Sequence, residues 1–204
     1  MPIRASTVVL ILFLLAILGI GGCGVGRYNS LAKGKASIEA GWAEVDNQYK
    51  ARADLVPNLV ATVKGVAEFE QKTITDVTEA RAAVGKVQMP STLPTDPAQL
   101  DAYIKAQQGL SGALGRLFAV AENYPALKAT ESFRDLQNQL EGRENRIAVA
   151  RRDYIDAIRN YETSRTTFPG NFIAGLFHFE KVPQPTIAPE ERNVPKVDFG
   201  SEKK

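Results

Sequence analysis

The stretch KARADLVPNLVATVKG, residues 50–65, decides the fold, because it has helical character on both sides of a proline. Proline lacks a backbone N–H, and its ring clashes with the preceding turn, so it costs about 3 kcal/mol inside a helix. One interpretation is a new helix, with Asp54 as its N-cap and Pro57 in its first turn. The other is a single kinked helix in which Pro57 gives up its bond to the carbonyl of Ala53. Both predict a long rod with a bend near its middle.

Apolar residues recur at helical spacing on both sides of this stretch. They follow one another mainly at steps of three, four or seven, as expected for the buried face of an amphipathic helix. Residues 28 to about 85 are therefore predicted to be helical, with the break or kink at Pro57. The stripe consists of Leu31, Ile38, Trp42, Val45, Tyr49, Leu59, Val63, Val66, Ile74, Val77 and Val84.

Two further long helices are predicted, separated by turns. Three prolines within residues 86–97 end the first helical region, and a helix is expected over 98–123. Three glycines on that helix are expected to let a neighbouring helix approach closely. They are Gly109, Gly112 and Gly115. After the turn NYPALKA, residues 123–129, a helix is predicted over 130–165.

The last helix carries a heptad pattern, formed by Leu140, Ile147, Tyr154 and Tyr161. Arg143 falls on an adjoining row and is expected to run its stem along the core edge, with its head in water. A helix of that length spans about 54 Å, so the helices must lie alongside one another. With 204 residues and no useful β alternation, the chain is predicted to be all-α. The predicted architecture is an elongated antiparallel bundle of three to four helices, formed by residues 28–181.

Residues 1–27 are predicted to be the membrane anchor. Residues 8–22 are apolar and uncharged and follow the positive Arg4, which predicts either an uncleaved transmembrane helix or a signal peptide. The sequence IGGC also resembles a bacterial lipoprotein signal, in which case cleavage would precede Cys23 and lipid would be attached to its thiol. The glycines of residues 21–26 predict either a joint between anchor and body or a signal cleavage region. The signal-like start favours a body outside the cytoplasm.

The segment FPGNFIAGLFHFEK, residues 168–181, concentrates apolar side chains at steps of four, four and three. They are Phe168, Phe172, Leu176 and Phe179. These residues form either a lid over one end of the core or an exposed surface for a partner or a membrane interface. The proline-rich, charged residues 182–204 are predicted to be a disordered tail.

No chemical activity is predicted from the residue types. The net charge of +2 is dispersed, which argues against a nucleic-acid partner. Cys23 and His178 are the single cysteine and the single histidine and lie far apart in the sequence, so neither a metal site nor a histidine-based triad is expected. Phosphate-loop and dinucleotide motifs are absent from the sequence. We therefore expect no catalytic, metal or cofactor residues, and no enzyme.

Two blocks of the sequence resemble the LemA family of bacterial membrane-attached helical proteins. Residues 28–81 contain the Tyr-Asn start, Trp42, the run Asp54-Leu-Val-Pro57-Asn58-Leu-Val and a Thr-Glu-Ala-Arg close. Residues 123–181 contain the Tyr-Pro-x-Leu-Lys-Ala turn and the Phe-Pro-x-Asn-x-Ile-Ala ending. The resemblance implies a single anchor and a helical bundle outside the cytoplasm, and it implies no catalytic residue.

The leading functional hypothesis is a membrane-anchored, non-enzymatic scaffold or adaptor of the bacterial cell envelope, whose partners are the membrane and envelope or membrane proteins. One alternative is a small-molecule or lipid binding module, with a cavity near Gly109, Gly112 and Gly115. The other is an unrecognised envelope hydrolase, which would require carboxylates converging around Asp54 or His178.

Overall fold

The computed structural model describes residues 5–66, 69–87, 89 and 93–185. Within these ranges the chain is helical and contains no strand, which confirms the predicted all-α class and the long apolar N-terminal helix. The predicted disordered tail was placed at residues 182–204, which is wrong for its first residue: Val182 is buried in the core, and its N–H donates to Oε1 of Glu162 at 3.1 Å. Residues 186–204 lie outside the described residues. The helices are α1 (Ala5–Lys64), α2 (Gln71–Lys86), α3 (Pro97–Ala121), α4 (Pro125–Ala129), α5 (Glu131–Thr166) and α6 (Gly170–Leu176).

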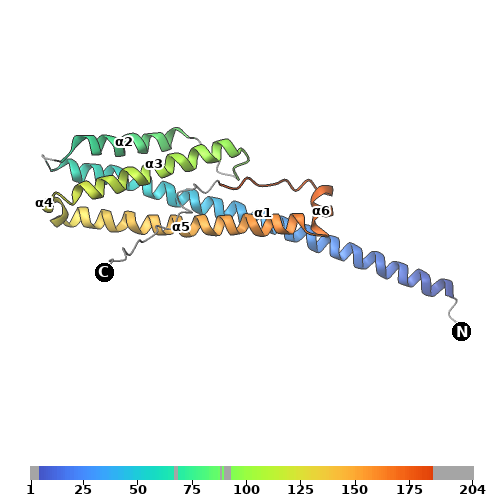
Figure 1. Ribbon diagram of the computed structural model, residues 1–204. Coiled ribbons are helices and arrows are strands. Elements are labelled where there is room, and N and C mark those ends of the chain that lie inside the picture. Colours follow the sequence, from blue (N-terminus) through green and yellow to red (C-terminus); the bar gives the residue numbers. More distant parts are fainter. Residues whose placement is uncertain (1–4, 67–68, 88, 90–92, 186–204) are drawn as a thin grey trace, which may run out of the picture.

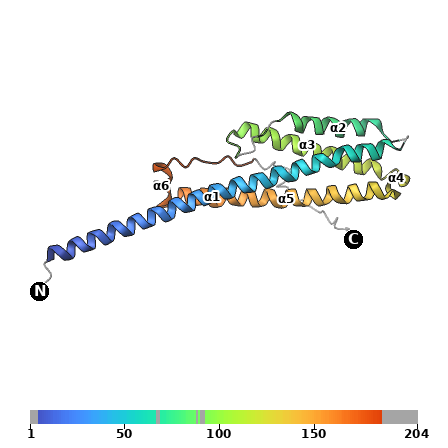
Figure 2. The same cartoon turned by 180° about the vertical axis from the view of Figure 1, so that it is seen from behind.

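Helices α1, α2, α3 and α5 lie side by side, and the N-terminal part of α1 projects beyond them (Figures 1 and 2). The most extensive helix contact joins α1 to α5, and the next joins α2 to α3. The short helix α6 lies beside α1 at the end of the body nearest the N-terminus, and the chain after it runs back along the body (Figure 1). We call the part of the described chain from residue 28 onward the helical body.

Helix α1 continues through Pro57 without interruption, so the interpretation as one continuous helix is confirmed and the restart with Asp54 as an N-cap is wrong. The predicted helical region up to residue 85 breaks elsewhere, because α1 ends at Lys64 and α2 begins at Gln71. The carbonyl of Ala53, which Pro57 cannot bond, instead accepts a hydrogen bond from Nε of Arg81 in α2, at 3.0 Å. A side chain from the neighbouring helix thus replaces the missing backbone donor. The helix survives the proline because tertiary contacts satisfy the group that the proline leaves open.

The predicted glycine joint is also continuous helix, because α1 crosses residues 21–26 without a break. A Cβ placed on Gly21, Gly22 or Gly26 would meet nothing within 4 Å. Within the described structure, anchor and body are therefore one helix rather than two hinged parts.

Close approach of helices occurs at two other glycines, Gly34 and Gly41 of α1. A Cβ on Gly34 would lie 3.2 Å from Cδ2 of Tyr161, and one on Gly41 would lie 3.2 Å from Cα of Tyr154. Both pairs recur after seven residues, in opposite chain directions, so α1 and α5 are antiparallel. Each glycine lets α5 approach so closely that a Cβ there would require the tyrosine to shift by a few tenths of an ångström.

The close approach predicted at Gly109, Gly112 and Gly115 is wrong, because all three are exposed on α3. A Cβ at Gly109 or Gly115 would meet nothing within 4 Å, and one at Gly112 would meet only the Arg116 side chain of the same helix, at 3.8 Å. The leucines of α3 occupy the buried face instead. Gly115 lines an open pocket of about 410 Å³ between α3 and α5, together with Leu140 and Glu144.

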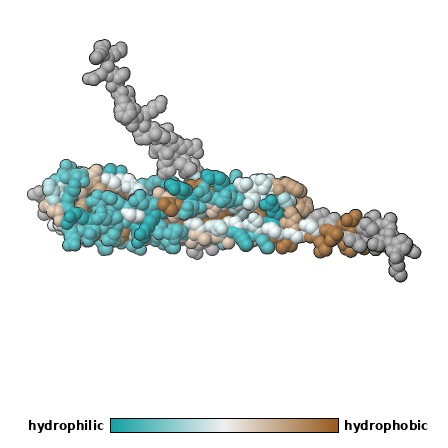
Figure 3. Space-filling model, turned by 90° about the horizontal axis from the view of Figure 1, so that it is seen from below, coloured by the Kyte–Doolittle hydropathy of each residue, from teal (hydrophilic) through white to brown (hydrophobic). Residues whose placement is uncertain are grey.

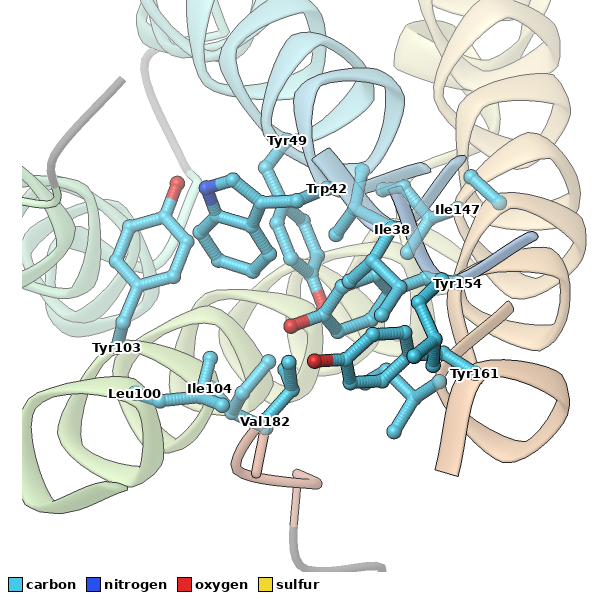
Figure 4. Packing of buried hydrophobic residues seen from close by; sticks show 14 of the residues in the cluster. Ile38, Trp42, Tyr49, Leu100, Tyr103, Ile104, Ile147, Tyr154, Tyr161 and Val182 are labelled. Carbon is cyan, nitrogen blue, oxygen red and sulfur yellow. The ribbon is translucent and has the colours of Figure 1, made fainter. Parts of the chain in front are cut away.

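The core of the body consists of two clusters of buried side chains. The first joins α1, α3, α5, α6 and the segment containing Val182, and the second joins α1, α2, α3, α4 and α5. Rings dominate the first cluster (Figure 4), where the Trp42 ring centroid lies 5.9 Å from that of Tyr103 and 5.6 Å from that of Tyr154. Such tilted aromatic pairs are favourable beyond their buried area.

The two buried tyrosines next to Trp42 differ in their hydrogen bonds. The Tyr103 hydroxyl donates to Oδ1 of Asp46 at 2.9 Å. The Tyr154 hydroxyl is buried without a hydrogen-bond partner among the described residues. Burial raises the pKa of Tyr154 to about 12, and burial followed by the Asp46 carboxylate raises the pKa of Tyr103. Both rings are held in the neutral form inside the fold.

Replacing Tyr154 with phenylalanine is expected to stabilise the body by about 1 kcal/mol, because it removes a buried hydroxyl that lacks a partner. The matched change Tyr103→Phe is expected to destabilise by about 1–2 kcal/mol, because it removes a bond to a carboxylate. Urea unfolding of the full chain in detergent, followed by circular dichroism, measures both. A loss of stability in Tyr154→Phe would contradict this assignment.

The same tyrosines predict a loss of stability in alkali. Above about pH 10 the unfolded tyrosines lose their protons while Tyr154 keeps its own up to about pH 12, so the unfolded state binds fewer protons. Stability therefore falls as pH rises, by about 1.4 kcal/mol per pH unit for each such group. Unfolding midpoints measured across this range should fall less steeply in Tyr154→Phe than in the wild type.

Candidate functional site

A layer of polar side chains crosses the body between the two apolar clusters. Its centre is Arg52 of α1, whose side chain is fully buried. Nη1 donates to Oγ of Ser111 and to Oε1 of Glu144, and Nη2 donates to Oε1 of Gln107 at 2.6 Å and to the Gln107 carbonyl at 3.1 Å. The guanidinium carbon also lies 5.3 Å from the centre of the Tyr49 ring. We call Arg52, Gln107, Ser111 and Glu144 the polar layer.

The positions of Arg52 and Gln107 follow from the same helical steps that place the core. Arg52 lies three residues after Tyr49 and four before Val56, and Gln107 lies four after Tyr103 and three before Leu110. Both therefore occupy core positions. Sequence reasoning missed them because the apolar stripe was traced through hydrophobic residues alone. A charged residue at a core step is the signal that would have found the layer.

The polar layer is suited to fixing structure rather than to chemistry. Four of the five guanidinium N–H bonds of Arg52 are committed to three residues of α3 and α5. A buried charge is tolerated only when it is paired and hydrogen-bonded in this way, and it penalises arrangements that leave it unpaired. Arg143, on the adjoining row, is half-buried and donates to Oε1 of Gln48 at 3.1 Å.

A cavity of about 360 Å³ opens beside this layer, where α1, α2 and α3 meet. Asp46, Asp54, Lys50 and Arg81 line it together with Tyr103. The Asp46 carboxylate is engaged, because Oδ2 lies 2.6 Å from Nζ of Lys50 and Oδ1 accepts from Tyr103. Among the described residues, no group of three or more His, Cys, Asp or Glu side chains is arranged to hold a metal ion.

The family-motif residues do not form one cluster of reactive groups. Trp42 is buried in the aromatic core, and its indole nitrogen has no hydrogen-bond partner among the described residues. Asp54, Pro57 and Asn58 lie exposed on α1, and the Asn58 carbonyl accepts from Oγ1 of Thr62 at 2.9 Å. Two parts of the motif are connected instead by a hydrogen bond from Nε of Arg81 to the carbonyl of Ala53, the group that Pro57 cannot bond. That arrangement is structural.

The apolar ending divides into a buried and an exposed part. Phe179 packs on Tyr28, with ring centroids 5.5 Å apart, and is half-buried, so it does not share the exposed surface predicted for it. We call the exposed residues the aromatic patch; they are Phe168 (82% exposed), Phe172 (68%), Leu176 (59%) and Phe177 (52%). The binding role predicted for Phe168, Phe172 and Leu176 remains a prediction.

The division arises from a chain reversal at the end of α6. His178 has a φ of 56°, in the left-handed region, and the N–H of Phe179 donates to the carbonyl of Ala174 at 2.9 Å. This is the Schellman arrangement that ends many helices, with His178 at the position where glycine is preferred. After the reversal Phe179 is half-buried and Phe177 remains more than half exposed, although the Phe177 ring also packs on Tyr28, with ring centroids 4.9 Å apart. His178 thus has a structural place at a helix end, on the rim of a cavity of about 540 Å³.

Replacing His178 with glycine is expected to stabilise the end of α6 by about 0.5–1 kcal/mol. Glycine adopts the left-handed conformation without the Cβ clash, although part of this gain is offset by its freedom in the unfolded chain. His178→Ala retains the Cβ and is the control, for which no gain is expected. Hydrogen exchange of the Phe179 amide measures the effect locally, and faster exchange in His178→Gly would contradict the assignment.

Cys23 is exposed on α1, one residue before Gly24. A Cβ on Gly24 would lie 3.7 Å from Cδ1 of Ile173, so α6 packs against α1 at this level. Helix α1, which contains Cys23, is long enough and apolar enough near its N-terminus to cross a membrane. Lipidation of Cys23 remains a prediction.

The profile of the LemA family matches residues 41–199, which is most of the chain. The chain belongs to the LemA family. The match includes Trp42, the proline run of α1, the polar layer and the whole of α5 and α6. The resemblance to the LemA family that residues 28–81 and 123–181 indicated is therefore confirmed.

Relatives of this LemA-family chain fall into two groups. Magnetosome proteins MamQ 1 and MamQ 2 of Paramagnetospirillum magneticum AMB-1 are each 35% identical to it over 80 residues, 39% of this chain and 29% of theirs. Protein LemA of Metamycoplasma hominis is 24% identical over 151 residues, 74% of this chain and 64% of its own. The chain thus matches less than a third of the length of the magnetosome proteins. Family membership and the apolar N-terminal helix indicate a membrane-associated protein.

Proposed function

We propose that this LemA-family protein is a membrane-anchored scaffold of the bacterial cell envelope, which holds a rigid helical body near the membrane for another envelope protein to bind. The observation that carries the proposal is the continuity of α1 from its apolar start to Lys64. From Arg27 to Lys64 this helix extends about 55 Å. Because the helix continues from the anchor into the body without a hinge, it would hold a binding surface of the body at a fixed distance from the membrane.

The internal chemistry of the body supports a structural role. Its buried charge is held by four hydrogen bonds, and its aromatic core is packed around Trp42. These interactions stabilise one arrangement of the helices, although Nε of Arg52 and Nε2 of Gln107 are buried without a hydrogen-bond partner among the described residues. The polar residues of the family motif serve the same arrangement through Arg81.

The anchor is proposed to be an uncleaved transmembrane helix, with the body outside the cytoplasm. The mass of the mature protein tests the anchor, because an intact N-terminus, an acylated Cys23 and a free downstream terminus differ in mass. For the sidedness, Cys23→Ser is combined with Ala43→Cys at an exposed position of α1. Labelling by a membrane-impermeant maleimide in intact cells is expected, and labelling only after lysis would contradict an external body.

The proposed partner surface is the face of α1 and α5 around Val149. This side chain is 51% exposed and lines a shallow groove with Gln48 and Arg146. A photo-crosslinking amino acid at Val149 in the full chain is expected to give a defined protein adduct in intact cells. The control is the same amino acid at Ala119, exposed on α3. Absence of a protein adduct from both positions would contradict the scaffold proposal.

A further inference from the structure

We propose that the aromatic patch sits in the lipid–water interface of the membrane that α1 crosses, as a second contact between the protein and the bilayer. The proposal rests on the membrane anchoring proposed above and assigns the patch a partner, which is lipid. It places the α6 end of the body directly against the membrane surface. The body would then meet the bilayer at two points, α1 and the patch.

The position of α6 along α1 is the first argument. Residues 5–26 carry no charge, and Arg27 is the first charged residue after them. As helix, this run is about 33 Å long, close to the thickness of the hydrocarbon core of a bilayer. Ile173 of α6 packs at Gly24, within the last turn of the run. The helix that carries the patch therefore lies at the depth where hydrocarbon gives way to headgroups.

The composition of the segment is the second argument. Residues 166–177 contain no charged side chain; Arg165 precedes them, and Glu180 and Lys181 are the next charged residues after them. Four apolar side chains of this segment are more than half exposed on a body whose other apolar residues are largely buried. Apolar side chains at the edge of an anchor are typical of segments that lie in the membrane interface. Covering them with lipid removes apolar surface from water, which is favourable.

Continuity with the anchor favours lipid over a protein partner. The exposed apolar side chains between Leu10 and Leu18 of α1 belong to the surface that we propose the bilayer covers, and α6 packs on α1 further along, at Gly24. Figure 3 shows apolar surface on the projecting part of α1 and again at the adjoining end of the body, while the rest of this face is mainly hydrophilic. A protein covering the patch would have to occupy the same depth as the headgroups around α1.

The test uses a single tryptophan as a depth probe in the full chain. Phe172→Trp is combined with Trp42→Phe, and the protein is placed in nanodiscs of phosphatidylcholine and phosphatidylglycerol. We expect blue-shifted emission that is largely quenched by lipids brominated close to the headgroup and less by lipids brominated near the chain ends. The matched control is Val149→Trp in the same background, expected to emit at long wavelength without quenching.

A second probe avoids the change at Trp42, which the core could tolerate poorly. Cys23→Ser is combined with Phe172→Cys and, as the control, with Val149→Cys, and each cysteine carries a nitroxide. At residue 172 we expect high accessibility to oxygen and low accessibility to a water-soluble nickel complex, with the reverse at 149. High nickel accessibility at 172 in chains that remain in the nanodisc would overturn the proposal. So would a probe shielded from both water and lipid quenchers, because a protein would then cover the patch.

These results separate the inference from the anchoring on which it rests. If the chain fails to enter nanodiscs and remains in the soluble fraction, the anchoring proposal fails, and the inference fails with it. If the chain is anchored but residue 172 meets water, the anchoring stands and only the assignment of the patch is overturned.

Discussion

Replacing Pro57 with alanine is expected to stabilise the helical body by about 2 kcal/mol, the largest gain that a single change in this chain should give. Alanine restores an N–H that can bond the carbonyl of Ala53 and removes the clash of the proline ring with the preceding turn. Pro57 is exposed, so the change leaves no cavity. Urea unfolding of the full chain in detergent, followed by far-UV circular dichroism, measures the gain.

A double-mutant cycle with Arg81 tests the reason for this gain. In the natural chain, Arg81→Met leaves the Ala53 carbonyl without its donor and should cost about 1 kcal/mol. In the Pro57→Ala background the carbonyl has a backbone partner again, so the same change should cost little. Arg116→Met, at an exposed position of α3, controls for loss of a positive charge. Equal costs of Arg81→Met in the two backgrounds would show that the proline and the arginine are not coupled.

Replacing Glu144 with alanine is expected to destabilise the body by about 3 kcal/mol, because it leaves the buried guanidinium of Arg52 without its carboxylate. The estimate is at the low end for a buried pair, since the Glu144 side chain is 43% exposed and already partly screened by water. Chemical unfolding of the full chain provides the measurement. Glu141→Ala, one turn earlier on the exposed face of α5, should change stability by less than about 0.5 kcal/mol.

The opposite half of the pair should behave differently. Arg52→Met removes the buried charge and fills most of the same volume, while Glu144 remains at the edge of the body, where water can solvate it. We therefore expect Arg52→Met to cost less than Glu144→Ala. A larger cost for Arg52→Met would mean that the layer contributes net stability, rather than mainly penalising a charge that has lost its partner.

The all-α class could be predicted from the sequence because the helical periodicity extends over many residues and does not depend on any single one. The heptads of α5 and the stripe of α1 reflect burial of a whole face, and that term is far larger than any local preference. At Pro57 the interpretation as one continuous helix is confirmed, and the restart at Asp54, which rested on local capping propensity, is wrong. The carbonyl that the proline leaves open is bonded by an arginine from another helix. The glycines of residues 21–26 are likewise helical despite the low helix propensity of glycine.

The features missed from the sequence depend on contacts between distant segments. Arg52 occupies a core step, but nothing in its own helix shows that Glu144 and Gln107 will meet it. Phe177 is exposed in place of the predicted Phe179 because His178 adopts a left-handed backbone conformation. A glycine at this position would have indicated that conformation in the sequence, whereas a histidine does not. The aromatic ending was recognisable as special, whereas its depth relative to the anchor required the packing of Ile173 on α1.

The repeated fit of glycine to tyrosine along α1 and α5 leaves an ambiguity in how these helices can be aligned. Sliding one helix past the other by seven residues, about 10 Å, would still seat one tyrosine over one glycine. The place of Glu144 would then fall to Gln137 in one direction and to Arg151 in the other. Neither residue offers a carboxylate to Arg52. A shifted pairing of α1 and α5 would therefore be unstable, because it would bury the guanidinium of Arg52 without an anionic partner.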